Sequence, residues 1–251
     1  GTGSPTVILE SGLGTGGTLD WTLVHDEIAR FTRTCAYDRA GIMWSDPKNT
    51  PQDAAAVEHA LTKTSLSAEY KAEVEASIEH VVSFAGWTDK IDAVAGNMNP
   101  VAGPFFNIST LQATGVVAAF APQDSALLGL VNTIAPAIVS GNAIVVIASE
   151  SLPLPAITLT EVLATSDLPG GVVNVLTGKE AEISPWLASH QDVNAIDLEG
   201  TSNSVELEIQ AAQNLKRVIR KGDFARLGAK GSLNHITNLM EVKTVWHPKG
   251  N

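Results

Sequence analysis

The chain has 251 residues, of which 44% are hydrophobic and 17% are charged, as in folded globular proteins. Its formal net charge of −11 argues against a nucleic-acid partner, because binding a phosphate backbone requires clustered lysine and arginine. The single cysteine excludes an internal disulfide and favours a reducing compartment.

A membrane-spanning helix needs about 20 consecutive apolar residues. The longest candidate, Ile134–Ala148, is interrupted by Pro136, Gly141 and Asn142, so we expect no membrane partner. The chain begins at Gly1 without a charged segment followed by an apolar one, so we also expect no signal peptide. These features together predict a cytoplasmic protein.

The first residues predict strand, glycine-rich turn, helix and strand, with the strands at Pro5–Glu10 and Arg33–Tyr37 and the helix at Leu19–Phe31. The turn reads GLGTGG over residues 12–17, which satisfies G-x-G-x-x-G, and Asp38 closes the second strand. Such glycines let a backbone approach a pyrophosphate, while the carboxylate binds ribose hydroxyls. A dinucleotide-binding turn and a purely structural turn both remain open.

Residues 1–47 also resemble the opening of the α/β-hydrolase family. The letters that carry this resemblance are SGLG at residues 11–14, Trp21 and YDRAG at residues 37–41; Met43 departs from the family's usual glycine. Hydrolase chemistry further requires a serine in a G-x-S-x-G elbow. That motif does not occur in the sequence, so the resemblance implies a hydrolase-like segment without its catalytic centre.

A polar stretch with two prolines, Pro47–Gln52, predicts a linker. We therefore expect two parts, residues 1–50 and residues 51–251. Helices are predicted at Asp53–Lys63 and Ser67–Ala85, followed by irregular chain at Gly96–Asn107.

From Val116 onward, short β-branched runs alternate with segments of helical length, which predicts an α/β fold in three layers with a mostly parallel, Rossmann-like sheet. The expected strands are Val116–Phe120, Ala143–Ile147, Val172–Leu176 and Val193–Leu198. The expected helices are Asp124–Val139, Pro155–Thr165, Glu180–Ser189 and Asn203–Lys221, the last with Asn203 and Glu206 as a capping pair and basic residues in its final turn. The segment Asp223–Asn251 yields no assignment.

Residues 67–247 resemble the NAD(P)-binding domain of the aldehyde dehydrogenase superfamily. The phrases that carry the resemblance are GVV at 115–117, IAPA at 134–137, GN at 141–142, SE at 149–150, LPGGVVNV at 168–175 and TG at 177–178. The resemblance implies NAD as cofactor and, as the family reaction, NAD(P)-dependent oxidation of an aldehyde to a carboxylic acid.

The family's P-W-N-F-P loop, whose asparagine stabilises an oxyanion, corresponds to residues 122–126 here. The resemblance implies cofactor contacts from Ala121, Pro122, Gln123 and Asp124, although a carboxylate at Asp124 would repel developing negative charge. Alternatively, Asp124 or Ser125 only caps the following helix.

The family's K-P-S-E segment corresponds to Ser149 and Glu150 here, and its lysine is missing. The resemblance implies that Glu150 binds ribose hydroxyls and favours NAD over NADP, although it could also be a solvated loop carboxylate. Gly178 would allow close approach of the pyrophosphate or only form a turn. Gly200 and Thr201 stand where the family has a Gly-Ser pair that contacts the cofactor.

The resemblance also requires a nucleophilic cysteine, and the single cysteine, Cys35, lies far outside the matching region and is expected to be structural. The family's Glu-Leu-Gly-Gly general-base motif is absent, so we predict no catalytic residue. The six histidines lack metal-ligand spacing, so we predict no metal site.

We therefore predict an aldehyde-dehydrogenase-like protein that binds a small-molecule nucleotide without a catalytic thiol of its own, as a homo-oligomer or partner subunit. The alternatives are an α/β-hydrolase-type esterase and a non-enzymatic partner or fusion protein joined near residues 47–66.

Overall fold

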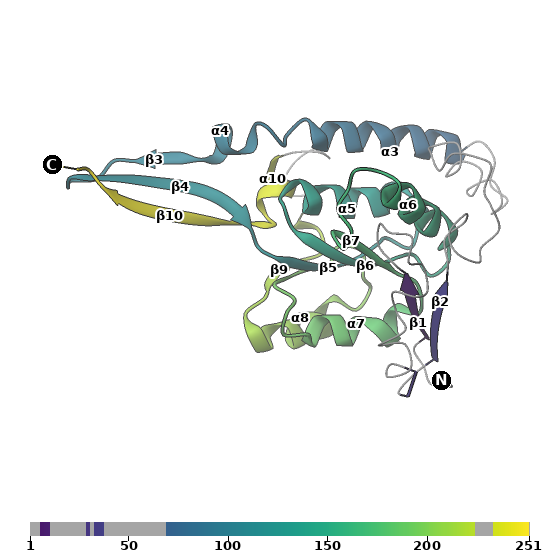
Figure 1. Ribbon diagram of the computed structural model, residues 1–251. Helices are drawn as coiled ribbons and strands as arrows, with labels where there is room; N and C mark the ends of the chain where they lie inside the picture. The colour runs from purple at the N-terminus through teal and green to yellow at the C-terminus, as the bar shows by residue number, and fades with distance from the viewer. Residues whose placement is uncertain (1–5, 11–28, 31–32, 38–68, 224–232, 251) are drawn as a thin grey trace.

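The computed structural model describes residues 6–10, 29–30, 33–37, 69–223 and 233–250. At its centre lies a five-stranded parallel sheet in the order β7-β6-β5-β8-β9 (Figure 1). The chain moves outward from β5 to β7 and then returns to the opposite side of β5, so the strand order reverses between β5 and β8. The strands span Val116–Phe120 (β5), Ala143–Ile147 (β6), Val173–Leu176 (β7), Ala195–Asp197 (β8) and Arg217–Ile219 (β9).

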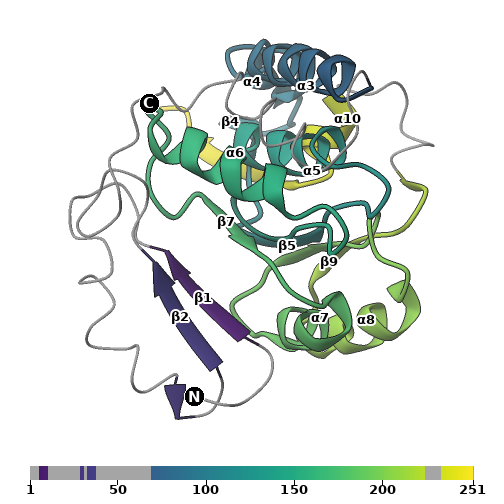
Figure 2. The same cartoon turned by 90° about the vertical axis from the view of Figure 1, so that its right-hand side faces the viewer.

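Helices cover both faces of this sheet (Figures 1 and 2). Helices α5 (Leu128–Val139) and α6 (Leu154–Ala164) lie on one face, with α3 (Glu69–Ala85) packed against α5. Helices α7 (Glu180–Ser189) and α8 (Ser204–Ala211) lie on the other face. The three-layer α/β architecture with a parallel sheet is therefore confirmed.

Alternation along the strands divides the core between the two faces. Along β5, Val117 and Ala119 pack with Leu130 and Ile134 of α5, whereas Ala118 and Phe120 face the layer of α7 and α8. The central strand is thus buried on both sides, which explains its continuous apolar sequence.

Several predicted boundaries are confirmed. Strands β5 and β6 and helix α7 have the predicted bounds, and helix α3 ends at Ala85 as expected. Helix α5 begins at Leu128, four residues after the predicted start. Strand β8 is shorter than predicted.

The predicted helix Asn203–Lys221 is wrong beyond Ala211. A 3-10 turn at Ala212–Asn214 follows α8, Leu215 takes a left-handed φ of 57°, and the chain continues as β9. Val218 and Ile219 gain more by completing the sheet than by extending a helix, because Ile219 is buried against the α5 face. The expected capping pair is also not formed, since the Asn203 side chain donates to Glu206 and caps no backbone group.

Part of the segment expected to be irregular, together with the unassigned C-terminal segment, builds an antiparallel arm. Strands β3 (Asn97–Asn99), β4 (Phe105–Ala113) and β10 (Met240–Pro248) pair in the order β10-β4-β3, and the arm projects from the body (Figure 1). Short helices α4 (Ile91–Ala95) and α10 (Leu233–Thr237) flank its base. The sequence signal was weak because β4 and β10 contact each other across a separation of more than a hundred residues.

Strands β1 (Thr6–Glu10) and β2 (Arg33–Tyr37) pair in parallel as a separate two-stranded sheet. The predicted glycine-rich turn at residues 12–17, Asp38, helix Asp53–Lys63 and most of helix Leu19–Phe31 lie outside the described residues. Within the described part of the chain, no helix combines the length and apolarity needed to cross a bilayer.

Candidate functional site

The carboxyl ends of the parallel strands lie at one end of the sheet, next to the reversal of strand order between β5 and β8, which is where ligands bind in open α/β sheets. The loops after β5, β6, β7 and β8 therefore converge there. They carry every residue predicted to contact a cofactor: Ala121, Pro122, Gln123, Asp124, Ser149, Glu150, Gly178, Gly200 and Thr201.

Gln123 joins the loops after β5 and β6. Its Oε1 accepts hydrogen bonds from the backbone N–H of Glu150 at 2.8 Å and from Ser149 Oγ at 3.3 Å. Its Nε2 donates to the carbonyl oxygen of Ala121 at 3.3 Å. Ser149 is buried and Gln123 is exposed, and their hydrogen bonds orient the two loops relative to each other.

The start of helix α5 is held by a glutamate that the sequence did not single out. Glu73 of α3 accepts three hydrogen bonds through one carboxylate oxygen: from Ser125 Oγ at 2.8 Å and from the backbone N–H groups of Leu127 and Leu128 at 2.8 and 2.9 Å. The Ser125 hydroxyl in turn accepts from the backbone N–H of Gly129 at 2.7 Å. Glu73 and Ser125 therefore cap this helix, and Asp124 is exposed.

Glu73 does carry a sequence signal. Tyr70, Val74 and Ser77 are buried and mark the inward face of α3. Glu73 lies three residues after Tyr70 and directly before Val74, so its acidic side chain adjoins this inward face. A carboxylate in that position needs hydrogen-bond donors from another element.

A second chain of contacts links the loops after β6, β7 and β8. Glu150 Oε1 accepts from the backbone N–H of Glu180, in the first turn of α7, at 2.5 Å. The buried Glu180 carboxylate accepts from the Thr201 hydroxyl, which itself accepts from the backbone N–H of Asn203 at 3.1 Å. Glu150 and Thr201 are therefore connected through Glu180.

Gly178 and Gly200, two of the predicted cofactor contacts, are glycine for different structural reasons. Gly178 has a φ of 150°, which an L side chain rarely adopts, so this position requires glycine for the turn into α7. Gly200 lies so close to β5 that an added Cβ would be 1.9 Å from the carbonyl oxygen of Phe120. The close contact with the end of β5 thus suffices to explain Gly200.

Carboxylates gather between the ends of β8 and β9. Asp197 is almost fully buried, and this burial raises its pKa to about 7, although it accepts a 2.9 Å hydrogen bond from the backbone N–H of Glu199. The charges of Glu199 and Asp223 act in the same direction as burial and contribute to this raised pKa. Glu199 also accepts from the backbone N–H of Gly222 at 2.5 Å. Asp197 was not predicted from the sequence as a site residue; its signal is an acidic residue within an otherwise apolar strand.

A pocket of about 590 Å³ opens between the loops after β6 and β7. Its described lining includes two charged residues, Glu150 in the loop after β6 and Lys179 in the loop after β7. Thr177 and Gly178, which directly precede Lys179, also line the pocket. Pro153, Leu154 and Ile157 form an aliphatic wall at the start of α6. The pocket thus offers an apolar wall, a carboxylate and an ammonium group.

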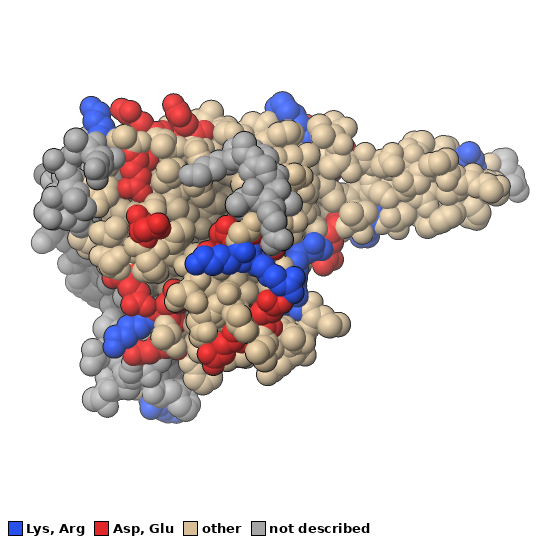
Figure 3. Space-filling model, turned by 180° about the vertical axis from the view of Figure 1, so that it is seen from behind, with Lys and Arg blue, Asp and Glu red and all other residues tan. Residues whose placement is uncertain are grey.

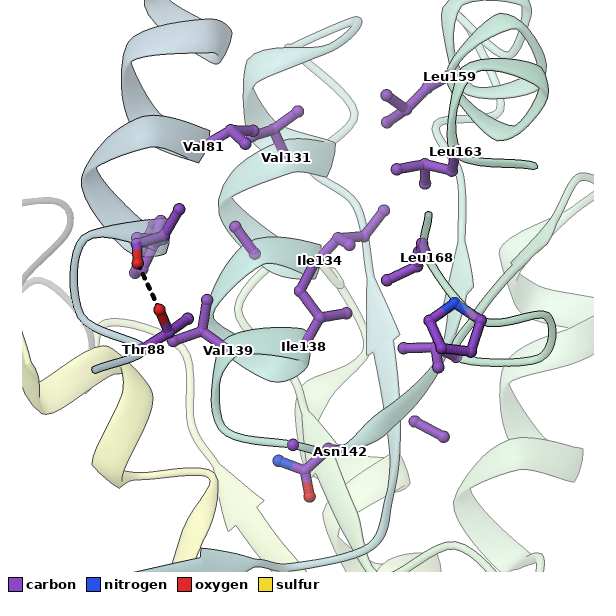
Figure 4. A pocket seen from close by; sticks show the side chains of 17 residues that line it. Val81, Thr88, Val131, Ile134, Ile138, Val139, Asn142, Leu159, Leu163 and Leu168 are labelled. Carbon is purple, nitrogen blue, oxygen red and sulfur yellow. Dashed lines mark hydrogen bonds between the residues drawn. The ribbon is translucent and has the colours of Figure 1, made fainter. Parts of the chain in front are cut away.

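A second cavity of about 580 Å³ lies toward the opposite end of the sheet, between α3, α5 and α6 (Figure 4). Ile134 and Ile138 of α5 lie between Val81 of α3 and Leu163 of α6. The Asn142 amide at one side is already bonded to Ser140 Oγ and the carbonyl oxygen of Leu239. None of the described residues that line this cavity has a titratable side chain, so these residues are suited to packing and not to acid–base chemistry.

The described residues contain no cluster of three or more histidine, cysteine, aspartate or glutamate side chains able to hold a metal ion. Cys35 lies in β2, outside the five-stranded sheet.

Residues 29–223 match the model of the aldehyde dehydrogenase family. The chain is 32% identical over 151 residues to "Aldehyde dehydrogenase, cytosolic 1" of Mus musculus, covering 59% of this chain and 30% of that protein. It is 34% identical over 136 residues to omega-crystallin of Enteroctopus dofleini, covering 53% of this chain and 27% of that protein.

Solved structures also resemble the fold. Betaine aldehyde dehydrogenase of Staphylococcus aureus, solved in complex with NAD+, matches with a TM-score of 0.54 and 25% identity, over 60% of this chain and 30% of that one. PnpE of Pseudomonas sp. WBC-3 matches with a TM-score of 0.54 and 30% identity, over 58% and 30%. The chain thus spans about 30% of the length of the relatives that it matches. Because the family match covers more than half of the sequence, the chain belongs to the aldehyde dehydrogenase family.

Proposed function

We propose that this chain binds NAD at the carboxyl ends of its parallel strands and has no catalytic thiol of its own there. The observation that carries this proposal is the contact chain from Glu150 through Glu180 to Thr201, which ties three strand-end loops into one surface. Membership of the family and the NAD+ complex of the Staphylococcus aureus relative support the choice of cofactor.

The adenosine half of NAD fits the residues present. The 590 Å³ pocket has the size of a small-ligand site, with an aliphatic wall for a base and the Glu150 carboxylate for ribose hydroxyls. A negative charge at Glu150 would repel a 2′-phosphate and so favour NAD over NADP. We therefore expect Ser149, Glu150, Gly178, Gly200 and Thr201 to surround the cofactor.

The fit is poorer for the pyrophosphate, because backbone amides at the starts of α5 and α7 already donate to Glu73 and Glu150. We expect weak binding for this reason. Bound NAD would supply a hydride acceptor, but the oxidation of an aldehyde also needs a nucleophile, and Cys35 lies in β2 of a separate sheet. We propose nucleotide binding as the activity of this chain, with aldehyde oxidation as the reaction of a complete family member.

Calorimetric titration of the full chain with NAD tests the proposal. We expect a dissociation constant in the high micromolar to millimolar range, weakened at least fivefold by Glu150→Ala. The absence of heat and of any fluorescence change at millimolar NAD would reduce the chain to a scaffold.

We further propose that the antiparallel arm mediates assembly with a second copy or with a partner subunit. Strands β3 and β4 contain no aspartate, glutamate, lysine or arginine, and one face of the arm shows few charges (Figure 3). Exposed apolar side chains lie on both faces of the arm: Met98, Phe106 and Ile108 of β3 and β4 on one face, and Val242 and Trp246 of β10 on the other. Apolar surface of this extent is typical of an interface.

The cytosolic relative from Mus musculus supports the cytoplasm as the location of this protein.

The alternative function, a hydrolase-type esterase formed by residues 1–50, is favoured by one observation: β1 and β2 pair in parallel, as the opening strands of that family would. Labelling with a fluorophosphonate probe would identify a reactive serine, and a protein that stays unlabelled would exclude the esterase.

Limited proteolysis tests whether the chain consists of two units. Release of stable fragments of residues 1–50 and 51–251 would support two separate units, whereas a chain that stays uncut and melts cooperatively would not.

A further inference from the structure

The pocket between the loops after β6 and β7 contains one cationic side chain among its described lining residues, Lys179. This lysine directly precedes helix α7 and follows Gly178, whose positive φ turns the chain at the pocket wall. It is largely exposed, with an ion pair to Glu182 one turn ahead at 3.5 Å. Such exposed pairs contribute little, so Lys179 can exchange this contact for another anion at small cost.

A helix start is normally the place where an anion binds, because its free N–H groups and the helix dipole favour negative charge. Here the backbone N–H of Glu180, in the first turn of α7, donates to Glu150 at 2.5 Å. The chain's own carboxylate thus occupies the position that a phosphate would take. A phosphate entering this pocket must therefore be neutralised by a side chain.

The wider surroundings strengthen that requirement. Glu199 and Asp223 follow β8 and β9, on the other side of β5 from the pocket, and they add negative potential at the same end of the sheet. Arg220 follows β9 at the same end of the sheet, but its Nε donates to the Glu208 carboxylate at 2.9 and 3.1 Å. Among the residues that the structure describes, Lys179 is the cation that lines the pocket itself.

We propose that Lys179 is the specificity-determining residue for phosphate in this pocket, and that the ligand class is a 5′-phosphorylated nucleoside, free or as the adenylate half of a dinucleotide. The inference rests on the proposed nucleotide-binding function. The base lies against Leu154 and Ile157, the ribose hydroxyls bind Glu150, and the 5′-phosphate binds the Lys179 ammonium group near Gly178. Leu154 is 49% exposed, so its side chain is available for this contact.

The experiment compares adenosine, adenosine 5′-monophosphate and adenosine 2′-monophosphate by calorimetry on the full chain and on Lys179→Gln. For the parent we expect the 5′-monophosphate to bind about tenfold more tightly than adenosine, which corresponds to about one charge-assisted hydrogen bond. Lys179→Gln should abolish this gain and leave adenosine binding within twofold. Raising the salt concentration should weaken the 5′-monophosphate only in the parent, because exposed charges are screened.

Lys221→Gln is the matched control, since it removes the same charge at the same end of the sheet from a residue outside the pocket lining. Equal losses in the two variants would overturn the inference, because they would indicate only a general charge effect. Unchanged 5′-monophosphate binding in Lys179→Gln, or a loss confined to the 2′-monophosphate, would overturn it while the nucleotide site stands. If none of the three ligands binds the parent, this inference and the proposed function both fail.

Discussion

Asp197 places a carboxyl group at the buried end of β8, and its environment makes the stability of the protein depend on pH. The group's pKa rises from 3.8 to about 7 on folding, mainly because burial disfavours the charged form. Between these values the folded state holds a proton that the unfolded state has released. Stability contributed by this group is therefore complete below about pH 4 and is lost as the pH rises to about 7.

Asp197→Asn removes this titration while an amide oxygen can still accept the Glu199 N–H. The variant should gain stability relative to the parent as the pH rises from 4 to 7, by about 2–4 kcal/mol in total, and the difference should then level off. Urea denaturation at a series of pH values measures it. A difference that stays constant across this range would show that the carboxyl group is not buried as described.

Glu73 of α3 caps the start of α5 through a single carboxylate oxygen. Glu73→Ala removes three hydrogen bonds from the start of α5 and leaves two backbone N–H groups without their carboxylate. We expect a loss of roughly 2–3 kcal/mol, more than for a simple helix cap, because the acceptor is charged. Glu79→Ala, on the exposed side of the same helix, is the control and should change stability by less than about 0.5 kcal/mol. Equal losses in the two variants would contradict the capping role.

At the scale of elements, close contact between β5 and the loop after β8 explains why Gly200 must lack a side chain. Gly200→Ala forces a methyl group against the Phe120 carbonyl, at 1.9 Å, so the loop carrying Thr201 has to move. We expect a loss of more than about 3 kcal/mol, or failure to fold. Gly171→Ala meets no atom within 4 Å but has a φ of 84°, so it should cost only about 1 kcal/mol from backbone strain. Thermal melts of both variants measure the contrast, and similar losses would mean that the loop has room to relax.

Elements with strong local patterns could be predicted from the sequence, and elements decided by distant contacts could not. Strands β5 and β6 were predicted with the correct bounds because their apolar runs end in turn residues. Strand β9 was missed because its charged residues follow α8 in helical spacing, and only the free edge of β8 makes a strand favourable there. The arm was missed for the same reason, since β4 and β10 need each other.

The candidate site shows the same division. The order of loops places Gln123, Ser149, Glu150 and Thr201 at one end of the sheet, as the strand pattern predicted. The direction of each polar atom was not predictable, because Gln123 and Glu150 bind backbone groups of other loops. Glu73 and Asp197 were missed since their roles depend on burial against elements distant in sequence.

At the scale of the whole molecule, the projecting arm predicts that the chain assembles. Val242 and Trp246 lie on one face of β10 and are 68% and 58% exposed, and Phe105 meets the Trp246 ring edge-on at 5.8 Å between ring centroids. Trp246→Glu places a charge on the face that carries Val242 and Trp246, so it should dissociate the assembly to monomers in sedimentation velocity without lowering the melting temperature of the monomer. Glu241→Gln, on the opposite face of the same strand, should leave the sedimentation coefficient unchanged. A parent chain that sediments as a monomer at high micromolar concentration would contradict the assembly. If Trp246→Glu also unfolds the chain, Val242→Glu provides the second test, because it places a charge on the same face at a side chain that is 68% exposed. Dissociation of a folded Val242→Glu chain would support the interface, and an unchanged sedimentation coefficient would contradict it.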